Sequence, residues 1–200
     1  ETHVKQTIKQ VNYKLSTLKN LSFLCHKTRT QFFKTFILPH FDYCFSLFIY
    51  MHNNQIDKLV KSFNTCMYRL FSINLHHLDL AEQLDKLEPL KILPLKYRFF
   101  YRFCIFSYKI MNNQILKSFK DSLVENKSEY ELRESSHSDF KVPFCKSKRG
   151  NMRLSIILPR LLNSVLKKST QHSFLDFKKS LIPIPNLNIY YNLFENKVMF

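Results

Sequence analysis

The chain has 200 residues, with 31 Lys and Arg against 15 Asp and Glu, a formal charge of +16 and a single glycine, Gly150. Phosphate-cradling loops and dinucleotide-binding fingerprints need several glycines, so this composition excludes both. A positive surplus of this size indicates a polyanionic partner, most often nucleic acid, although the base composition of an AT-rich genome produces the same bias without selection for binding.

The first part of the chain has the residue spacing of amphipathic helices. Apolar residues at every third or fourth position predict a helix over 3–24. A second helix is expected from about Thr28, and Pro39 should end or kink it because the proline ring removes a backbone donor. The expected buried face of this helix comprises Phe32, Phe33, Phe36 and Ile37. His40 and Asp42, which flank the break, are expected to cap loose backbone groups.

The pattern resumes with Phe41, Phe45 and Phe48, and Asn53-Asn54 is typical of a turn. Apolar spacing then predicts a helix from Ile56 to Phe71. A short acidic helix is expected to start at Asp79 or its neighbour, and a central helix is expected over 95–111, where apolar residues lie on most sides. Most of the sequence up to this point is therefore predicted to be helical.

The C-terminal part is more polar. Residues 125–153 predict a loop or extended arm, and two short helical patterns, "PRLLNSVLKK" and "HSFLDFKKSL", precede an irregular tail. We therefore expect an all-α fold with three regions. They are a helical bundle over 1–74, a second helical region over 75–124, and a basic arm with two short helices and a tail over 125–200. The longest apolar run, about 36–51, is shorter than the roughly 20 residues of a membrane-spanning helix, so we expect no membrane partner.

Residues with catalytic or metal-binding chemistry are scattered. The sequence has no adjacent aspartates, no nucleophile elbow and no paired histidines at metalloprotease spacing. We therefore expect neither a catalytic residue nor a metal site in this chain. The five cysteines include no CxxC pair and lie in apolar surroundings, which favours reduced, buried thiols in an intracellular protein.

Basic residues are concentrated at both ends of the chain, where they outnumber acidic ones. Such clusters suit phosphate contacts that are independent of base sequence and sensitive to salt. The candidate nucleic-acid contacts are Lys5, Lys9, Lys14, Lys19, Arg29, Lys34, Arg98, Arg102, Lys146, Lys148, Arg149 and Arg153. On a mostly buried helix, Arg98 and Arg102 could instead pair with acids such as Glu82 or Glu88.

Several segments, in order, carry a likeness to a known family. The most specific is "RTQFFKTFILPHFDYC", preceded by His3, Val4 and Lys14 and followed by Lys58, Leu59, Asn64 and Arg69. Further on come "LPLKYRFFYRFCIFSYKIMN", "ELR", "FKVPFCKSKRG" and "SFLDFKKSL". Over nearly its whole length the chain resembles the region C-terminal to the polymerase palm in reverse transcriptases of LINE-type, jockey-like non-LTR retrotransposons.

This resemblance implies that the first helices form a thumb, which grips the RNA/DNA template–primer duplex for an RNA-directed DNA polymerase. It implies an upstream palm domain of the same polyprotein that holds the catalytic aspartates and Mg²⁺, so the chain, which starts at Glu1, is expected to be a fragment without cofactor. It also implies a location in the nucleus and cytoplasm. The alternative is a helical protein–protein scaffold, domesticated from such an element or left by its decay, without a nucleic-acid role.

Overall fold

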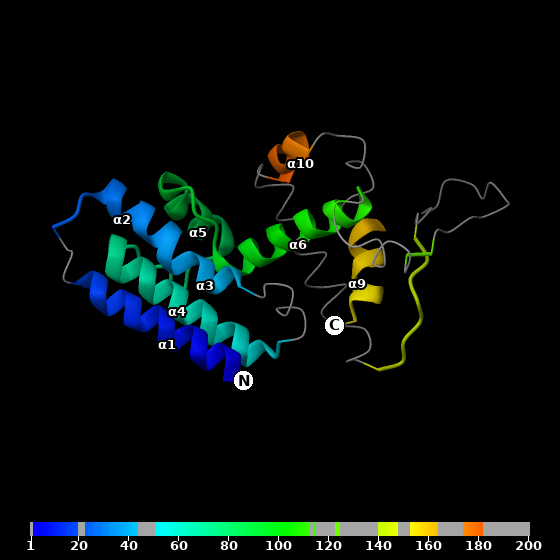
Figure 1. Ribbon diagram of the computed structural model, residues 1–200, viewed down its shortest axis with the longest axis horizontal. Coiled ribbons are helices and arrows are strands. Elements are labelled where there is room, and N and C mark those ends of the chain that lie inside the picture. Colours follow the sequence, from blue (N-terminus) through cyan, green and yellow to red (C-terminus); the bar gives the residue numbers. More distant parts are fainter. Residues whose placement is uncertain are drawn as a thin grey trace. The chain divides into compact units, whose positions relative to one another are not determined.

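The computed structural model describes residues 2–19, 23–43, 51–112, 114, 123–124, 140–147, 153–163 and 174–181 (Figure 1). Most of these residues are helical and none of them belongs to a β-strand, which confirms the predicted all-α fold. The chain divides into two compact units, Glu1–Phe99 and Phe100–Phe200. The boundaries predicted near 74 and 124 remain predictions.

The first unit is built around two parallel helices and a third that runs in the opposite direction. Helix α1 (Thr2–Lys19) lies beside α4 (Asn53–Phe71), and the two run the same way in Figure 1. Between them in sequence, α2 (His26–Phe32), the π-helical turn η1 (Phe33–Ile37) and α3 (Leu38–Asp42) follow one another as a single rod antiparallel to both. Helix α1 packs on α4, η1 and α3.

Apolar side chains from all three helical rods form the core of the first unit. The Phe63 ring lies in edge-to-face contact with the rings of Phe33 and Phe41, with centroid separations of 6.0 and 5.7 Å. Val11 and Ile37 are fully buried in the same unit. Burying such side chains contributes roughly 1.5–3 kcal/mol each, so this core is the main source of the unit's stability. The predicted buried position of Phe36 is wrong, because its side chain is 48% exposed.

Pro39 interrupts α-helical hydrogen bonding without ending the rod. A proline has no N–H to donate and its ring crowds the preceding turn, so the chain needs a local change of geometry there. The π turn Phe33–Ile37 provides it immediately upstream, and Pro39 then occupies the first turn of α3, where a missing donor is tolerated. The sequence predicted an end or a kink, and the structure has a π turn. Phe45 and Phe48 lie outside the described residues.

The ends of α4 have clear local causes. The turn predicted at Asn53-Asn54 is wrong, because these residues begin the helix and His52 is the N-cap, whose Nδ1 accepts a hydrogen bond from the Asn54 N–H at 3.4 Å. At the other end Ser72 adopts a left-handed conformation, with φ 59° and ψ 24°, and its N–H donates to the Tyr68 carbonyl. That conformation terminates the helix.

Three further elements complete the first unit. Asp79 caps α5 (Leu80–Leu87) through a reciprocal capping box with Glu82, which confirms the predicted start of this helix. The 3₁₀ turn η3 (Glu88–Leu90) follows and ends at Lys91, a left-handed residue with φ 52°. Helix α6 (Leu95–Met111), predicted over 95–111, begins in this unit and continues into the second.

The second unit contains the rest of α6 together with α9 (Leu154–Leu161) and α10 (Phe174–Leu181). The buried Phe177 ring of α10 stacks on Tyr108 of α6 at a centroid separation of 4.4 Å. The side-chain amide of Asn163 donates to the Phe140 carbonyl and accepts from its N–H, at 2.8 and 3.0 Å. Helix α9 begins upstream of the predicted pattern, so Pro159 lies inside the helix rather than at its start.

The cysteines do not share one environment. Cys66 and Cys104 are buried, as predicted, and burial raises the pKa of both thiols, that of Cys66 to about 12. The prediction is wrong for Cys25, which is exposed, and for Cys145, which is only partly covered. Cys44 lies outside the described residues. The four described cysteines are all free thiols.

Candidate nucleic-acid interface

Helices α1 and α4 together carry many cations and a single acid. The cations in these two helices are Lys5, Lys9, Lys14, Lys19, Lys58, Lys61 and Arg69. The acid is Asp57, whose carboxylate lies 3.9 Å from the Lys96 ammonium. Both side chains of that pair are well exposed, so water and salt screen it strongly. The adjacent pair of helices is therefore strongly positive.

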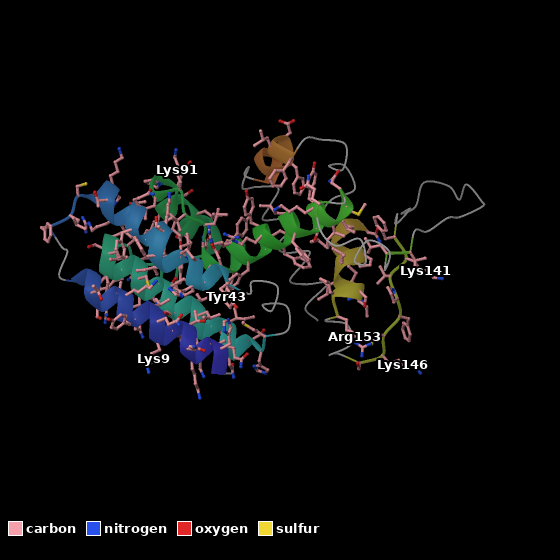
Figure 2. All side chains as sticks on the ribbon, in the orientation of Figure 1. Lys9, Tyr43, Lys91, Lys141, Lys146 and Arg153 are labelled. Atoms are coloured by element: carbon pink, nitrogen blue, oxygen red, sulfur yellow. The ribbon has the colours of Figure 1, made fainter. Side chains whose placement is uncertain are left out.

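Lys5 and Lys9 lie one turn apart on α1 and are exposed. In Figure 2, Lys9 points away from the helices of the first unit. On α4, Lys58, Lys61 and Arg69 are exposed on the side opposite its buried residues. The sequence-based set of candidate contacts did not include these three. Lys61 follows Lys58 by three residues and Arg69 follows Lys61 by eight, so all three lie away from the apolar face, and this pattern was the signal that could have found them.

Lys14, from the same predicted set, does not belong with Lys5 and Lys9. Its ammonium donates a hydrogen bond to the Phe36 carbonyl at 3.1 Å and lies 6.0 Å from the Phe36 ring centroid. The side chain is half-buried. Lys14 therefore ties α1 to η1.

Arg29 also makes a contact within the protein. Its guanidinium Nη1 donates to the carbonyl of Leu70 at 2.9 Å, across 41 residues of sequence. Leu70 belongs to the last turn of α4, where helix carbonyls lack intrahelical donors and the helix dipole is negative. Arg29 thus caps α4 from the neighbouring rod, and the structure gives it a stabilising role.

Arg98 is paired with Asp42. Its Nε and Nη2 donate to the two carboxylate oxygens of Asp42, each at 2.6 Å, and the two side chains are only 18% and 11% exposed. This pairing of the Asp42 carboxylate with a guanidinium was not predicted from the sequence, and the backbone-capping role of Asp42 remains a prediction. The suggested partners Glu82 and Glu88 are wrong for Arg98. Arg102, one turn further along α6, is half-buried.

Lys34 lies away from the α1 lysines. It is half-buried on η1, and burial, followed by the charges of Lys91 and Arg98, lowers its pKa. Lys91 and Lys9 lie on opposite sides of the first unit in Figure 2. The cations of this unit therefore lie on at least two of its sides.

The second unit has its own exposed cations. Lys146 and Arg153 are exposed, and both are labelled in Figure 2. Arg153 is also the N-cap residue of α9. Lys148 and Arg149 lie outside the described residues, as does the side chain of Lys19. Within the described part of the chain, no group of three or more His, Cys, Asp or Glu side chains is placed to hold a metal ion.

None of the described helices is both long and apolar enough to cross a bilayer. Comparison with known proteins finds no match: no protein-family model, no curated protein and no solved structure is significantly similar to this chain.

Proposed function

We propose that this chain binds an RNA/DNA template–primer duplex, as the thumb and following region of an RNA-directed DNA polymerase whose catalytic palm lies upstream. The observation that carries the proposal is the cationic surface of α1 and α4, with one screened acid among their residues. A duplex presents a phosphate about every 1.7 Å of its axis, so an exposed row of lysines gains affinity from several contacts at once.

The arrangement of the helices supports the same proposal. Lys5 and Lys9 follow one exposed edge of α1, and Lys58 and Lys61 follow the exposed face of α4, which runs beside α1 in the same direction. Along a helix, residues four apart are separated by about 6 Å. Two such rows can therefore follow a phosphate backbone over several nucleotides, and such contacts position a duplex without reading its bases.

The experiment that tests this function measures affinity for a fluorescent RNA/DNA hybrid between 50 and 200 mM salt. The wild-type chain should lose affinity steeply, because each phosphate contact contributes about 0.9 to the slope of log affinity against log salt. Lys9→Gln, Lys58→Gln and Lys61→Gln should each lower that slope by about one unit. A matched control is Lys91→Gln, an equal change of charge on the opposite side of the unit.

A scaffold role without nucleic acid is the second candidate. The observation in its favour is that Lys14, Arg29 and Arg98 all direct hydrogen bonds into the protein itself. Under this alternative the positive charge only solubilises the chain. Weak hybrid binding with a flat salt response, unchanged in the three Gln variants, would support the scaffold and contradict the proposed function.

A further inference from the structure

Four aromatic side chains follow the rod formed by α2, η1 and α3 at intervals of one turn: Phe32, Phe36, His40 and Tyr43. The rings of Phe32 and Phe36 are 4.6 Å apart between centroids. A π turn has more residues per turn than an α-helix. Side chains four residues apart therefore lie closer to a single line along the rod than they would on an α-helix. We call these four residues the aromatic row.

The row lies along the side of the rod that faces α1. Lys14 of α1 contacts the Phe36 carbonyl and ring, and His3 of α1 has its ring 5.8 Å from that of Tyr43. Although α1 borders the row, it does not cover it. Phe36 is 48% exposed and Tyr43 is 69% exposed. The neighbouring Phe33 is fully buried, so the exposed rings lie beside the core and are not part of it.

The surroundings of the row are positive. No acidic residue occurs from Thr2 to Phe41, and Lys14 lies directly beside the row. Asp42 is the one acid within the rod, and both of its oxygens accept from Arg98, so its charge is compensated. Burial, then the charge of Lys14, lowers the pKa of His40, which makes its imidazole a neutral ring at pH 7. Exposed rings beside the Lys14 ammonium suit a ligand that is both polyanionic and aromatic.

We propose that the aromatic row is a stacking surface for the unpaired bases of a single-stranded nucleic acid. The inference rests on the proposed function, to which it adds a second surface and a second kind of ligand. Bases of a single strand have free faces that can stack on Phe36 and Tyr43, while the Lys14 ammonium, which has donors left after its bond to Phe36, can contact a phosphate.

The exposed rings favour a single strand over a duplex, because only an unpaired base has a face free to stack on a side chain. A base pair inside a duplex offers no free face to such a row.

The first experiment uses Tyr43→Trp as a reporter in the full chain, which has no tryptophan of its own. Titration with a fully deoxythymidine 12-mer should quench the fluorescence of this single tryptophan, because a base stacks on the indole. An abasic 12-mer of equal phosphate number should bind more weakly and leave the fluorescence unquenched. Equal quenching by both oligonucleotides, or none by either, would overturn the inference.

The second experiment measures 12-mer affinity by anisotropy for Phe36→Ala and Tyr43→Ala. Each variant should bind about 5- to 150-fold more weakly, since removing one stacking side chain costs about 1–3 kcal/mol per base. Phe144→Ala removes an exposed ring from the other unit and should change nothing. Helix content measured by circular dichroism shows whether each variant is folded.

The same variants distinguish this inference from the function on which it rests. Phe36→Ala and Tyr43→Ala should bind the RNA/DNA hybrid as tightly as the wild-type chain does. If both variants bind the hybrid normally and also keep the wild-type affinity for the 12-mer, the aromatic row is not a stacking surface, and the proposed function is unaffected. Failure of the wild-type chain to bind either probe would contradict both.

Discussion

The Arg98 guanidinium holds both carboxylate oxygens of Asp42 at 2.6 Å, across 56 residues of sequence. The contact joins the end of α3 to the first turns of α6, two elements whose sequences lie on either side of α4 and α5. A bidentate pair of this kind is directional, because the planar guanidinium fits the carboxylate in few orientations. It therefore holds the first turns of α6 against the end of α3.

Removing one member of this pair should destabilise the first unit strongly. In Asp42→Ala, a guanidinium that is only 18% exposed in the wild-type protein loses its partner, and the expected loss of unfolding free energy is about 3–5 kcal/mol. Urea unfolding followed by circular dichroism measures it. Asp42→Leu combined with Arg98→Met should recover most of the loss, because no buried charge remains. A loss of unfolding free energy below about 1 kcal/mol in Asp42→Ala would show that the pair does not stabilise the first unit.

Ser72→Gly should stabilise α4. Ser72 ends this helix at φ 59°, in the left-handed region that glycine enters without a steric penalty. We expect a gain of about 0.5–1 kcal/mol in unfolding free energy, measured in the same urea assay. Ser72→Ala is the matched control, because alanine also lacks the hydroxyl but keeps Cβ, and it should give no gain. Equal effects of the two substitutions would contradict the conformational explanation.

Phe63→Ala and Phe36→Ala should differ greatly in unfolding free energy, although each removes a phenyl ring. Phe63 is 1% exposed and contacts Phe33 and Phe41, so its loss leaves a cavity that costs about 3–5 kcal/mol. Phe36 is half exposed, and water fills the space that its ring leaves. We expect a loss of about 1 kcal/mol or less for Phe36→Ala. Similar losses would mean that Phe36 belongs to the core after all.

How far the sequence predicts the fold depends on whether a signal is local. Periodicity predicts α1 and α4 because each buries one face along an unbroken helix, and an apolar run predicts α6, which is covered on most sides. The Asp79 capping box is also local, because it lies within four residues. The π turn shifts the angular register of the rod, so a wheel drawn at α-helical spacing places Phe36 inside. No local pattern shows that shift in advance.

The same distinction between local signals and long-range contacts applies to the residues of the candidate site. Exposure of Lys9 is predictable, because it lies opposite the apolar stripe of α1. The roles of Arg29 and Arg98 are not predictable, since their partners Leu70 and Asp42 lie 41 and 56 residues away in the sequence. A count of positive charges treats all of these residues alike. Only the packing of the helices separates cations that support the fold from cations that face solvent.

The described thiols should react in a defined order. The Thr28 hydroxyl, 3.1 Å from Sγ, and nearby backbone N–H groups stabilise the Cys25 thiolate and lower its pKa below the usual value of 9.0. Hydrogen bonds from Ser147 likewise lower the pKa of Cys145. The thiolate is the reactive form, so a lowered pKa increases the reactive fraction at any pH below it. Burial has the opposite effect on Cys66 and Cys104.

Alkylation of the folded chain with iodoacetamide near pH 7.5, followed by peptide mass mapping, should therefore label Cys25 and Cys145 first. The midpoint of the Cys25 rate profile against pH should lie below 9.0, because its thiolate is stabilised. Cys66 and Cys104 should react only in urea, at a rate limited by unfolding of the unit that contains each one. Thr28→Val removes the hydroxyl and should move the Cys25 midpoint upward, while Thr35→Val, a matched change on η1, should not. Rapid labelling of Cys66 without urea would contradict the packing around α4.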